Sequence, residues 1–199
     1  MLKSCFITVV LFLFFSCNKT SQPSYFQIIQ SKRDFIKISF KGPNSPLQEK
    51  DRDSFNGLSY YDIDSNFRII AKLKWNSNVK PVRLIKDTTI ASFYYPSAEI
   101  SFSIDEKQLK LTGYIPSLDK KNEIFIPFYD LTSGGETYSG GRFLEVSVKD
   151  TNTVTLDFNL AYNPYCVYNP RYICAVPPFA NDLKVYIFAG EKIPSFLKN

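Results

Sequence analysis

The residues best suited to chemistry lie in a glycine-rich stretch between positions 127 and 143. Two Gly-Gly pairs flank a tyrosine there, with an acidic residue before them and an arginine after them. Glycine pairs permit positive φ and close backbone approach, so such a loop can present N–H groups to an anion, with the arginine as a bidentate partner. The candidate binding residues are Asp130, Thr132, Ser133, Tyr138 and Arg142. The alternative interpretation is structural, with Arg142 paired internally to Asp130 or Asp157.

A second polar stretch, from position 157 to 181, is rich in Asn, Tyr and Pro. Asparagines can satisfy buried backbone groups, whereas loop tyrosines can either line a groove or cover a core. Its candidate binding residues are Asp157, Asn159, Tyr162, Asn163 and Asn181, and Glu191 near the C-terminus is hypothesised to pair with Arg142. Together the loops 128–142 and 157–181 predict a pocket for a small-molecule or anionic ligand.

The chain contains no histidine, which excludes a Ser-His-Asp triad, a Cys-His pair and a histidine metal site. We therefore predict no metal and no cofactor. An enzyme here has to work with carboxylates, Lys, Tyr, Ser or Cys. The catalytic hypothesis is a carboxylate-dependent hydrolase in which Asp130 and Asp157, or Glu191, form an acid/base pair. Glycoside hydrolysis would need those carboxyl groups roughly 5–10 Å apart across a cleft.

The N-terminus has the pattern of an export signal. The apolar run 5–15 would span about 16 Å as a helix, half of a bilayer core, so it is too short to be a transmembrane helix. The Ser16-Cys17 step at its end resembles the bacterial lipobox. We predict a lipoprotein signal peptide over 1–16, a Cys17 anchored in the lipid bilayer by its acyl chains, and a flexible tether over 17–24. The alternative is an ordinary secretory signal with a coincidental cysteine.

The residue after Cys17 is not aspartate, which under the sorting rules of such lipoproteins predicts the outer membrane, facing the periplasm. In that oxidising compartment the two remaining cysteines of the mature chain, Cys166 and Cys174, are expected to bond. Their spacing is neither the Cys-x-x-Cys of thiol exchange nor a zinc pattern. We therefore predict a structural disulfide between them.

One helix and a series of short strands have to position these residues. Apolar and charged side chains alternate at helical spacing over 25–40, which predicts an amphipathic helix. Period-two alternation from Phe67 to Trp75 predicts a half-buried strand. Further strands are predicted at 82–86, 90–95, 99–104, 108–115, 123–128, 143–149, 153–159 and 183–189. About nine strands predict a mainly β fold, a single antiparallel β-sandwich or barrel-like domain over 25–199.

Composition supports a globular protein and argues against one class of partner. Hydrophobic residues make up 44% of the 199 residues and charged residues 22%, which excludes a disordered chain. The net charge is +5, but the Lys and Arg residues are scattered singly or in pairs. Nucleic-acid binding requires a concentrated basic surface, so we predict no nucleic-acid partner.

Three motifs carry a resemblance to a known family. They are F-Y-D-x-T-S-G-x-x-T-Y-x-G-G-R-F over 128–143, D-F-N-x-A-Y-N-P-x-C over 157–166, and A-G-E-K over 189–192. On these motifs the chain resembles the bacterial family catalogued as domain of unknown function 1684. The resemblance covers most of the mature chain and implies no activity. Because some relatives lack an export signal, it implies that the anchor is an address and that the function resides in 128–191.

The favoured interpretation is an exported bacterial lipoprotein whose domain is a non-catalytic envelope module. It would bind a small ligand or a partner protein through the 128–142 and 157–181 loops. A structural lipoprotein with no ligand is ranked next, and the carboxylate-dependent hydrolase last.

Overall fold

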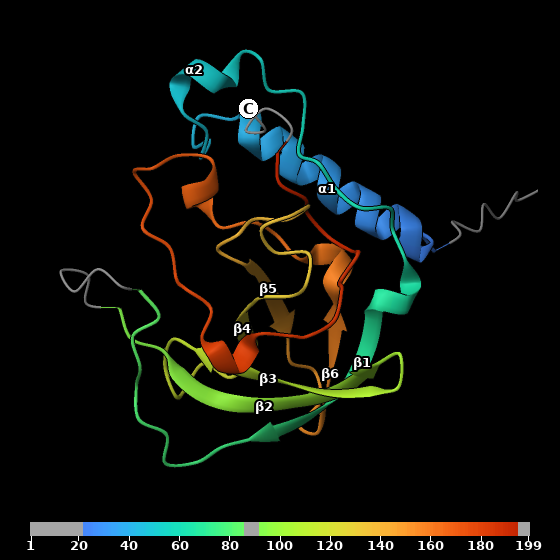
Figure 1. Cartoon of the computed structure of the whole chain (residues 1–199), viewed down its shortest axis with the longest axis vertical. Helices are drawn as coiled ribbons and strands as arrows, with labels where there is room; N and C mark the ends of the chain where they lie inside the picture. Colours follow the sequence, from blue (N-terminus) through green and yellow to red (C-terminus); the bar gives the residue numbers. More distant parts are fainter. Residues whose placement is uncertain (1–21, 86–91, 195–199) are drawn as a thin grey trace, which may run out of the picture.

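The structure is a computed structural model that describes residues 22–85 and 92–194. The predicted signal peptide, Cys17 and most of the predicted tether lie outside these described residues. Within the described ranges, the chain folds into one sheet with a helix packed across it (Figure 1). No helix in those ranges has the length and apolar character needed to cross a bilayer.

Helix α1 spans Tyr25–Lys41, so the helix predicted over 25–40 is confirmed. A capping box starts it: Ser24 Oγ accepts from the Gln27 N–H at 3.3 Å, and the Ser24 N–H donates to Gln27 Oε1 at 2.8 Å. Gly42 ends it, donating its N–H to the Ser39 carbonyl. A one-turn helix α2, Glu49–Arg52, follows.

The sheet has six antiparallel strands in the order β5-β4-β3-β2-β1-β6. They are β1 (Arg68–Trp75), β2 (Tyr95–Ile104), β3 (Lys107–Ile115), β4 (Glu123–Phe128), β5 (Arg142–Ser147) and β6 (Thr153–Asp157). The two end strands, β5 and β6, also contact each other, so the sheet is nearly closed into a barrel. A hollow of about 440 Å³ lined by α1, β5 and β6 lies at this seam.

The mainly β class and the barrel-like form are therefore confirmed, whereas about nine strands and a two-sheet sandwich are wrong. Of the predicted strand 82–86, the structure describes residues 82–85, and there it has one bridge, between Val82 and Tyr94. The predicted strand 90–95 lies partly outside the described residues, and its end opens β2. Segment 183–189 keeps the predicted alternation, with Leu183, Val185, Ile187 and Ala189 buried, but it forms no strand.

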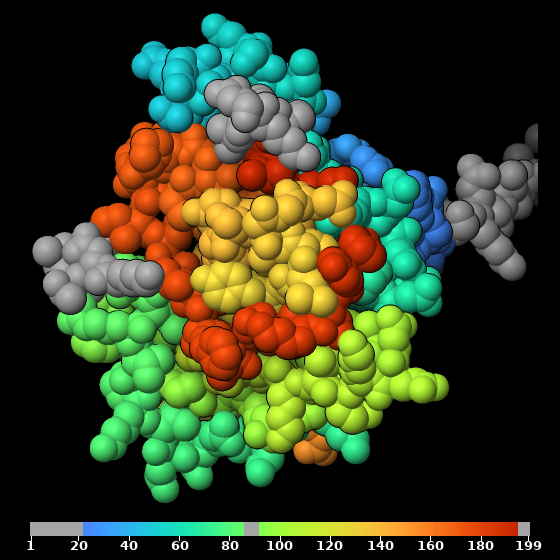
Figure 2. All heavy atoms as spheres, in the orientation of Figure 1, coloured from blue at the N-terminus to red at the C-terminus, as the bar shows by residue number. Residues whose placement is uncertain are grey.

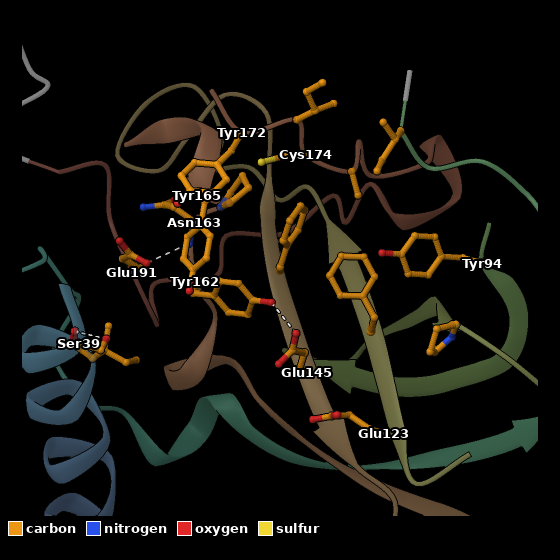
Figure 3. A pocket seen from close by; sticks show the side chains of 18 of the residues that line it. Ser39, Tyr94, Glu123, Glu145, Tyr162, Asn163, Tyr165, Tyr172, Cys174 and Glu191 are labelled. Atoms are coloured by element: carbon orange, nitrogen blue, oxygen red, sulfur yellow. Dashed lines mark hydrogen bonds between the residues drawn. The ribbon is translucent and has the colours of Figure 1, made fainter. Parts of the chain in front are cut away.

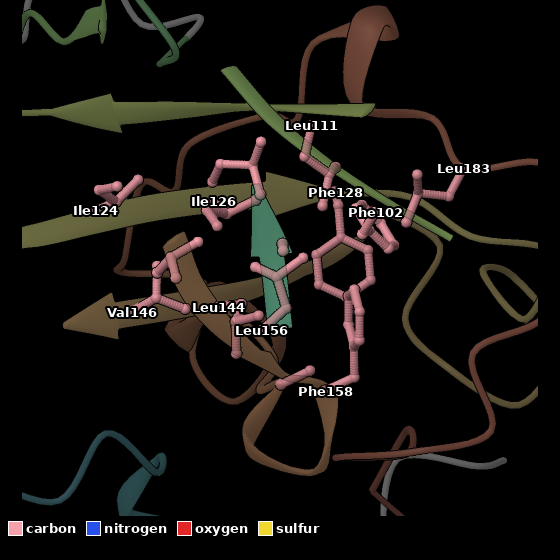
Figure 4. Close-up of a cluster of buried hydrophobic side chains, with 14 of the residues drawn as sticks. Phe102, Leu111, Ile124, Ile126, Phe128, Leu144, Val146, Leu156, Phe158 and Leu183 are labelled. Carbon is pink, nitrogen blue, oxygen red and sulfur yellow. The ribbon is translucent and has the colours of Figure 1, made fainter. Parts of the chain in front are cut away.

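The barrel is filled by the inward-facing residues of all six strands. Large side chains in this core include Phe102, Leu111, Ile124, Ile126, Phe128, Leu144, Leu156 and Phe158 (Figure 4). A second, smaller apolar cluster lies under the C-terminal end of α1 and comprises Phe40, Leu47, Phe55 and Tyr168. Phe40 stacks on Phe55 and meets Tyr168 edge-on at centroid distances of 5.6 and 5.0 Å. This cluster fixes the helix end against the 165–168 turn.

Candidate functional site

A buried ion pair occupies the centre of the glycine-rich loop. At the start of β5, Arg142 Nη2 donates to Asp130 Oδ2 at 3.1 Å and to the Ile187 carbonyl at 3.0 Å. Its Nη1 donates to the carbonyls of Ala189 and Glu191, the latter at 3.3 Å. Burial lowers the pKa of this guanidinium, and the Asp130 carboxylate opposes that shift. This is the internal pairing with Asp130 that the structural interpretation predicts.

The remainder of the loop folds onto the same carboxylate. Thr132 Oγ1 donates to Asp130 at 2.8 Å and Ser133 Oγ donates to it at 3.2 Å. The amides of Gly134, Gly135 and Gly141 donate to carbonyls within the loop, so three of the four glycine amides proposed as an anion nest already have partners. Figure 2 shows this segment (yellow) in the middle of the visible face, bordered by the C-terminal segment (red).

Tyr138 belongs to a separate small cluster beside the two cysteines. Cys166 and Cys174 are free thiols, and the Cys166 N–H donates to Cys174 Sγ at 3.1 Å. Burial and the contact with Cys174 raise the pKa of the Cys166 thiol to about 12. Burial also raises the pKa of Tyr138, with the two thiols adding to the shift. The disulfide is not formed in this structure, but the thiols are adjacent, and the disulfide stays a prediction.

Asp157 and Asn159 tie the start of α1 to the end of β6. Asp157 Oδ1 accepts from the Tyr25 hydroxyl at 2.9 Å and from the Asn159 N–H at 3.2 Å. Asn159 in turn bonds both the N–H and the carbonyl of Asp64, at 2.9 and 2.7 Å. Asp157 and Asp130 thus lie in separate hydrogen-bond networks, which gives the proposed Asp130–Asp157 acid/base pair no support.

Asn181 is fully buried and connects three backbone segments. Its Nδ2 donates to the carbonyls of Thr112 and Pro127 at 2.9 and 2.8 Å, and its Oδ1 accepts from the Thr112 N–H at 2.7 Å. Because these donor and acceptor atoms all bond the protein's own backbone, Asn181 holds β3, β4 and the C-terminal segment together.

The three other predicted residues, Tyr162, Asn163 and Glu191, meet at a cavity of about 820 Å³. The cavity lies on the outer face of β4 and β5, and the C-terminal half of α1 and the 162–175 segment form its other walls (Figure 3). Two backbone hydrogen bonds between Phe143 and Tyr162, at 2.9 and 3.0 Å, hold that segment against the β5 edge. A volume of this size suits a small molecule.

The inner end of the cavity is polar and buried. Asn163 donates its backbone N–H to Glu191 Oε2 at 2.9 Å, and the Tyr168 hydroxyl donates to Glu191 Oε1. Burial raises the pKa of Glu191 to about 8, although the Asn163 hydrogen bonds and Arg142 act in the opposite direction. The hypothesised pairing of Glu191 with Arg142 takes place through the Glu191 backbone carbonyl, while its carboxyl group bonds Asn163 and Tyr168.

Sequence reasoning missed the acidic residues at the outer end. Glu145 accepts from the Tyr162 hydroxyl at 2.8 Å, and Glu123 lies on the neighbouring strand (Figure 3). Burial and the Glu145 carboxylate raise the pKa of Tyr162. In the sequence both glutamates are ordinary outward-facing strand residues, and both stay exposed in the structure. The packing of α1 and the 162–175 segment is what makes their face of the sheet one wall of a cavity. Among the described residues, no group of three or more acidic or cysteine side chains could hold a metal ion.

Comparisons with known proteins give the chain a family and a similar fold, but no activity. The family described as "Protein of unknown function (DUF1684)" matches residues 53–192. The solution NMR structure of an uncharacterized protein of Haloarcula marismortui is similar, with 33% sequence identity and a TM-score of 0.70 over 86% of this chain and 95% of that chain. No curated protein sequence matches the chain.

Proposed function

The chain belongs to the family described as Protein of unknown function (DUF1684), and from that premise we propose that it is an exported lipoprotein whose domain binds a small molecule. The cavity between α1, β4, β5 and the 162–175 segment is the binding site, and the lipid on Cys17 fixes the domain to the cell envelope. The family match begins at residue 53, so the anchor lies outside it. The anchor therefore supplies an address and the domain supplies the binding.

The observation that carries this proposal is the meeting of three predicted binding residues at one cavity. Tyr162, Asn163 and Glu191 come from positions up to 29 residues apart, yet all line the same space of about 820 Å³. The other predicted binding residues instead bond to one another or to the backbone, apart from Tyr138, which lies beside the two cysteines. We therefore propose that the ligand binds at the 162–175 segment and that the 128–142 loop has a structural role in the barrel.

The binding proposal is tested by thermal-shift screening of small metabolites on the purified mature protein, with two matched variants. Tyr165→Ala removes an aromatic side chain that lines the cavity and is 49% exposed. Tyr186→Ala removes an equally exposed tyrosine, 53%, that does not line it. A ligand of this cavity should stabilise the wild type and Tyr186→Ala but stabilise Tyr165→Ala less. Equal shifts in all three proteins, or no stabilising compound, would contradict the proposal.

The anchor is tested separately, because binding does not depend on it. Cells expressing the full chain are grown with a clickable palmitate analogue, and the protein is then isolated and examined for the label. We expect the label on the wild type and none on Cys17→Ser. An unlabelled wild-type protein that is nevertheless exported and cleaved would show that the leader is an ordinary secretory signal.

A further inference from the structure

The charge of the cavity wall is predominantly acidic. Two carboxylates line its outer part, those of Glu123 and Glu145, whereas Lys120 is its only lysine or arginine among the described residues. The Glu191 carboxyl adds little charge at pH 7, because burial raises its pKa to about 8. In the β4–β5 register Glu123 pairs with Ser147 and Phe125 with Glu145, so the two glutamates are diagonal neighbours on one face, about 7–8 Å apart. The outer part of the cavity therefore favours a positively charged ligand.

The inner part of the cavity is occupied by hydrogen bonds among the protein's own groups. The Asn163 side chain is 1% exposed, and its Nδ2 donates to the Lys192 carbonyl at 3.0 Å. Its Oδ1 accepts no hydrogen bond from the residues that the structure describes, but that oxygen is closed off from solvent. The charged group of a ligand therefore has to lie in the outer part of the cavity, beside Glu123 and Glu145.

A row of aromatic rings also lines the cavity. Tyr94, Phe125, Phe143 and Tyr162 follow one another at centroid distances of 5.6, 4.9 and 5.9 Å. All four line the cavity. A row of rings offers apolar area to a hydrocarbon or aromatic group, and its π-faces attract a cation. The wall therefore suits a ligand that has an apolar part as well as a charge.

From the acidic outer wall and the row of rings in the same cavity, we infer that the ligand is an organic amine: an ammonium group attached to an aromatic or aliphatic body. This inference rests on the proposed function, because it names the chemical class of ligand for the same cavity. The ammonium N–H groups would donate to the Glu123 and Glu145 carboxylates, while the apolar body lies along the rings.

The test uses three probes of similar size and shape: 2-phenylethylammonium, 2-phenylethanol and 3-phenylpropanoate. Binding to the mature protein in nanodiscs of zwitterionic lipid is measured by isothermal titration calorimetry, with empty nanodiscs as the blank. We expect the ammonium to bind at least about tenfold more tightly than the alcohol, the lower end for a charged hydrogen bond, and the carboxylate to bind weakest. The N,N,N-trimethyl form of the ammonium should bind less tightly, because it has no N–H to donate.

Two charge-neutralising variants serve as a matched pair. Glu145→Gln should weaken ammonium binding by about fivefold, as expected for a partly exposed ion pair, and leave the alcohol unaffected. Glu99→Gln, on β2 outside the cavity, should change neither. Tighter binding of the alcohol or the carboxylate, lost in Tyr165→Ala, would overturn the amine inference and leave the proposed function intact. Failure of all three probes at millimolar concentration would also overturn the amine inference, and the metabolite screen then decides the proposed function.

Discussion

Replacing Arg142 by alanine tests the claim that the glycine-rich loop is structural. The substitution removes four hydrogen bonds from a fully buried site: one to the Asp130 carboxylate and three to the carbonyls of Ile187, Ala189 and Glu191. Four bonds at about 0.5–1.5 kcal/mol each give a loss of about 2–6 kcal/mol. Breaking one side of a buried ion pair costs about 3–5 kcal/mol. The two routes agree on a loss of about 3–5 kcal/mol in unfolding free energy.

Urea denaturation of the purified mature protein measures this loss, and two further variants make the result specific. Lys110→Met breaks an exposed pair with Glu99, 3.5 Å apart, and should cost less than about 1 kcal/mol. Adding Asp130→Asn to Arg142→Ala should restore part of the stability, because the buried carboxylate then no longer lacks its cation. A loss below about 1 kcal/mol for Arg142→Ala, or no recovery in the double variant, would refute the structural role.

Three other predictions concern positions elsewhere in the domain. Burial raises the pKa of Glu191 from 4.5 to about 8. The protonated carboxyl therefore stabilises the fold fully below pH 4.5, and this stabilisation, up to about 5 kcal/mol, is lost as the pH rises through 8. In denaturant titrations the wild type should lose more stability between pH 5 and pH 8 than Glu191→Gln does. Gly141→Ala should lower the unfolding free energy by about 1–3 kcal/mol, because φ is 83° there and a Cβ would lie 2.6 Å from a carbonyl oxygen. In Gly135→Ala the new Cβ would have its nearest atom at 3.6 Å, so the same denaturant titration should show a loss of less than about 1 kcal/mol. In protein purified from the envelope, Cys166 and Cys174 should alkylate only after reduction, and alkylation without a reductant would rule out the disulfide.

The helix and six of the strands could be predicted because their periodicity follows directly from burial. Residues 25–40 show helical spacing, and the strand from Phe67 to Trp75 alternates with a period of two, since in both elements one face packs on the core. Segment 183–189 shows the limit of this reasoning. It alternates as a strand does, but the Ile187 N–H donates to the Asp130 carboxylate at 2.9 Å, and the Ile187 carbonyl accepts a hydrogen bond from Arg142. The side chains of Asp130 and Arg142 make the hydrogen bonds that a neighbouring strand would make in a sheet. The periodicity of the sequence does not distinguish these two cases.

The candidate site was less predictable than the fold, for a related physical reason. Residues such as Arg142 and Asn181 looked functional because buried polar side chains need several specific partners, and the same requirement applies to a residue that only holds backbone segments together. Glu145 and Phe125 could not be identified from the sequence. Their strand positions are ordinary, and their place in the cavity depends on α1 and the 162–175 segment, which lie far away in the sequence.

The residues that hold the fold together and the residues that line the cavity are different, which limits what family membership can say about the ligand. The residues that build the frame, Asp130, Arg142 and Asn181, lie within the family match over 53–192. One wall of the cavity comes from α1 (Tyr25–Lys41), which lies before that match. The family match alone therefore does not describe the whole cavity. The ligand has to be argued from the helix and the 162–175 segment of this chain, together with the strands that they face.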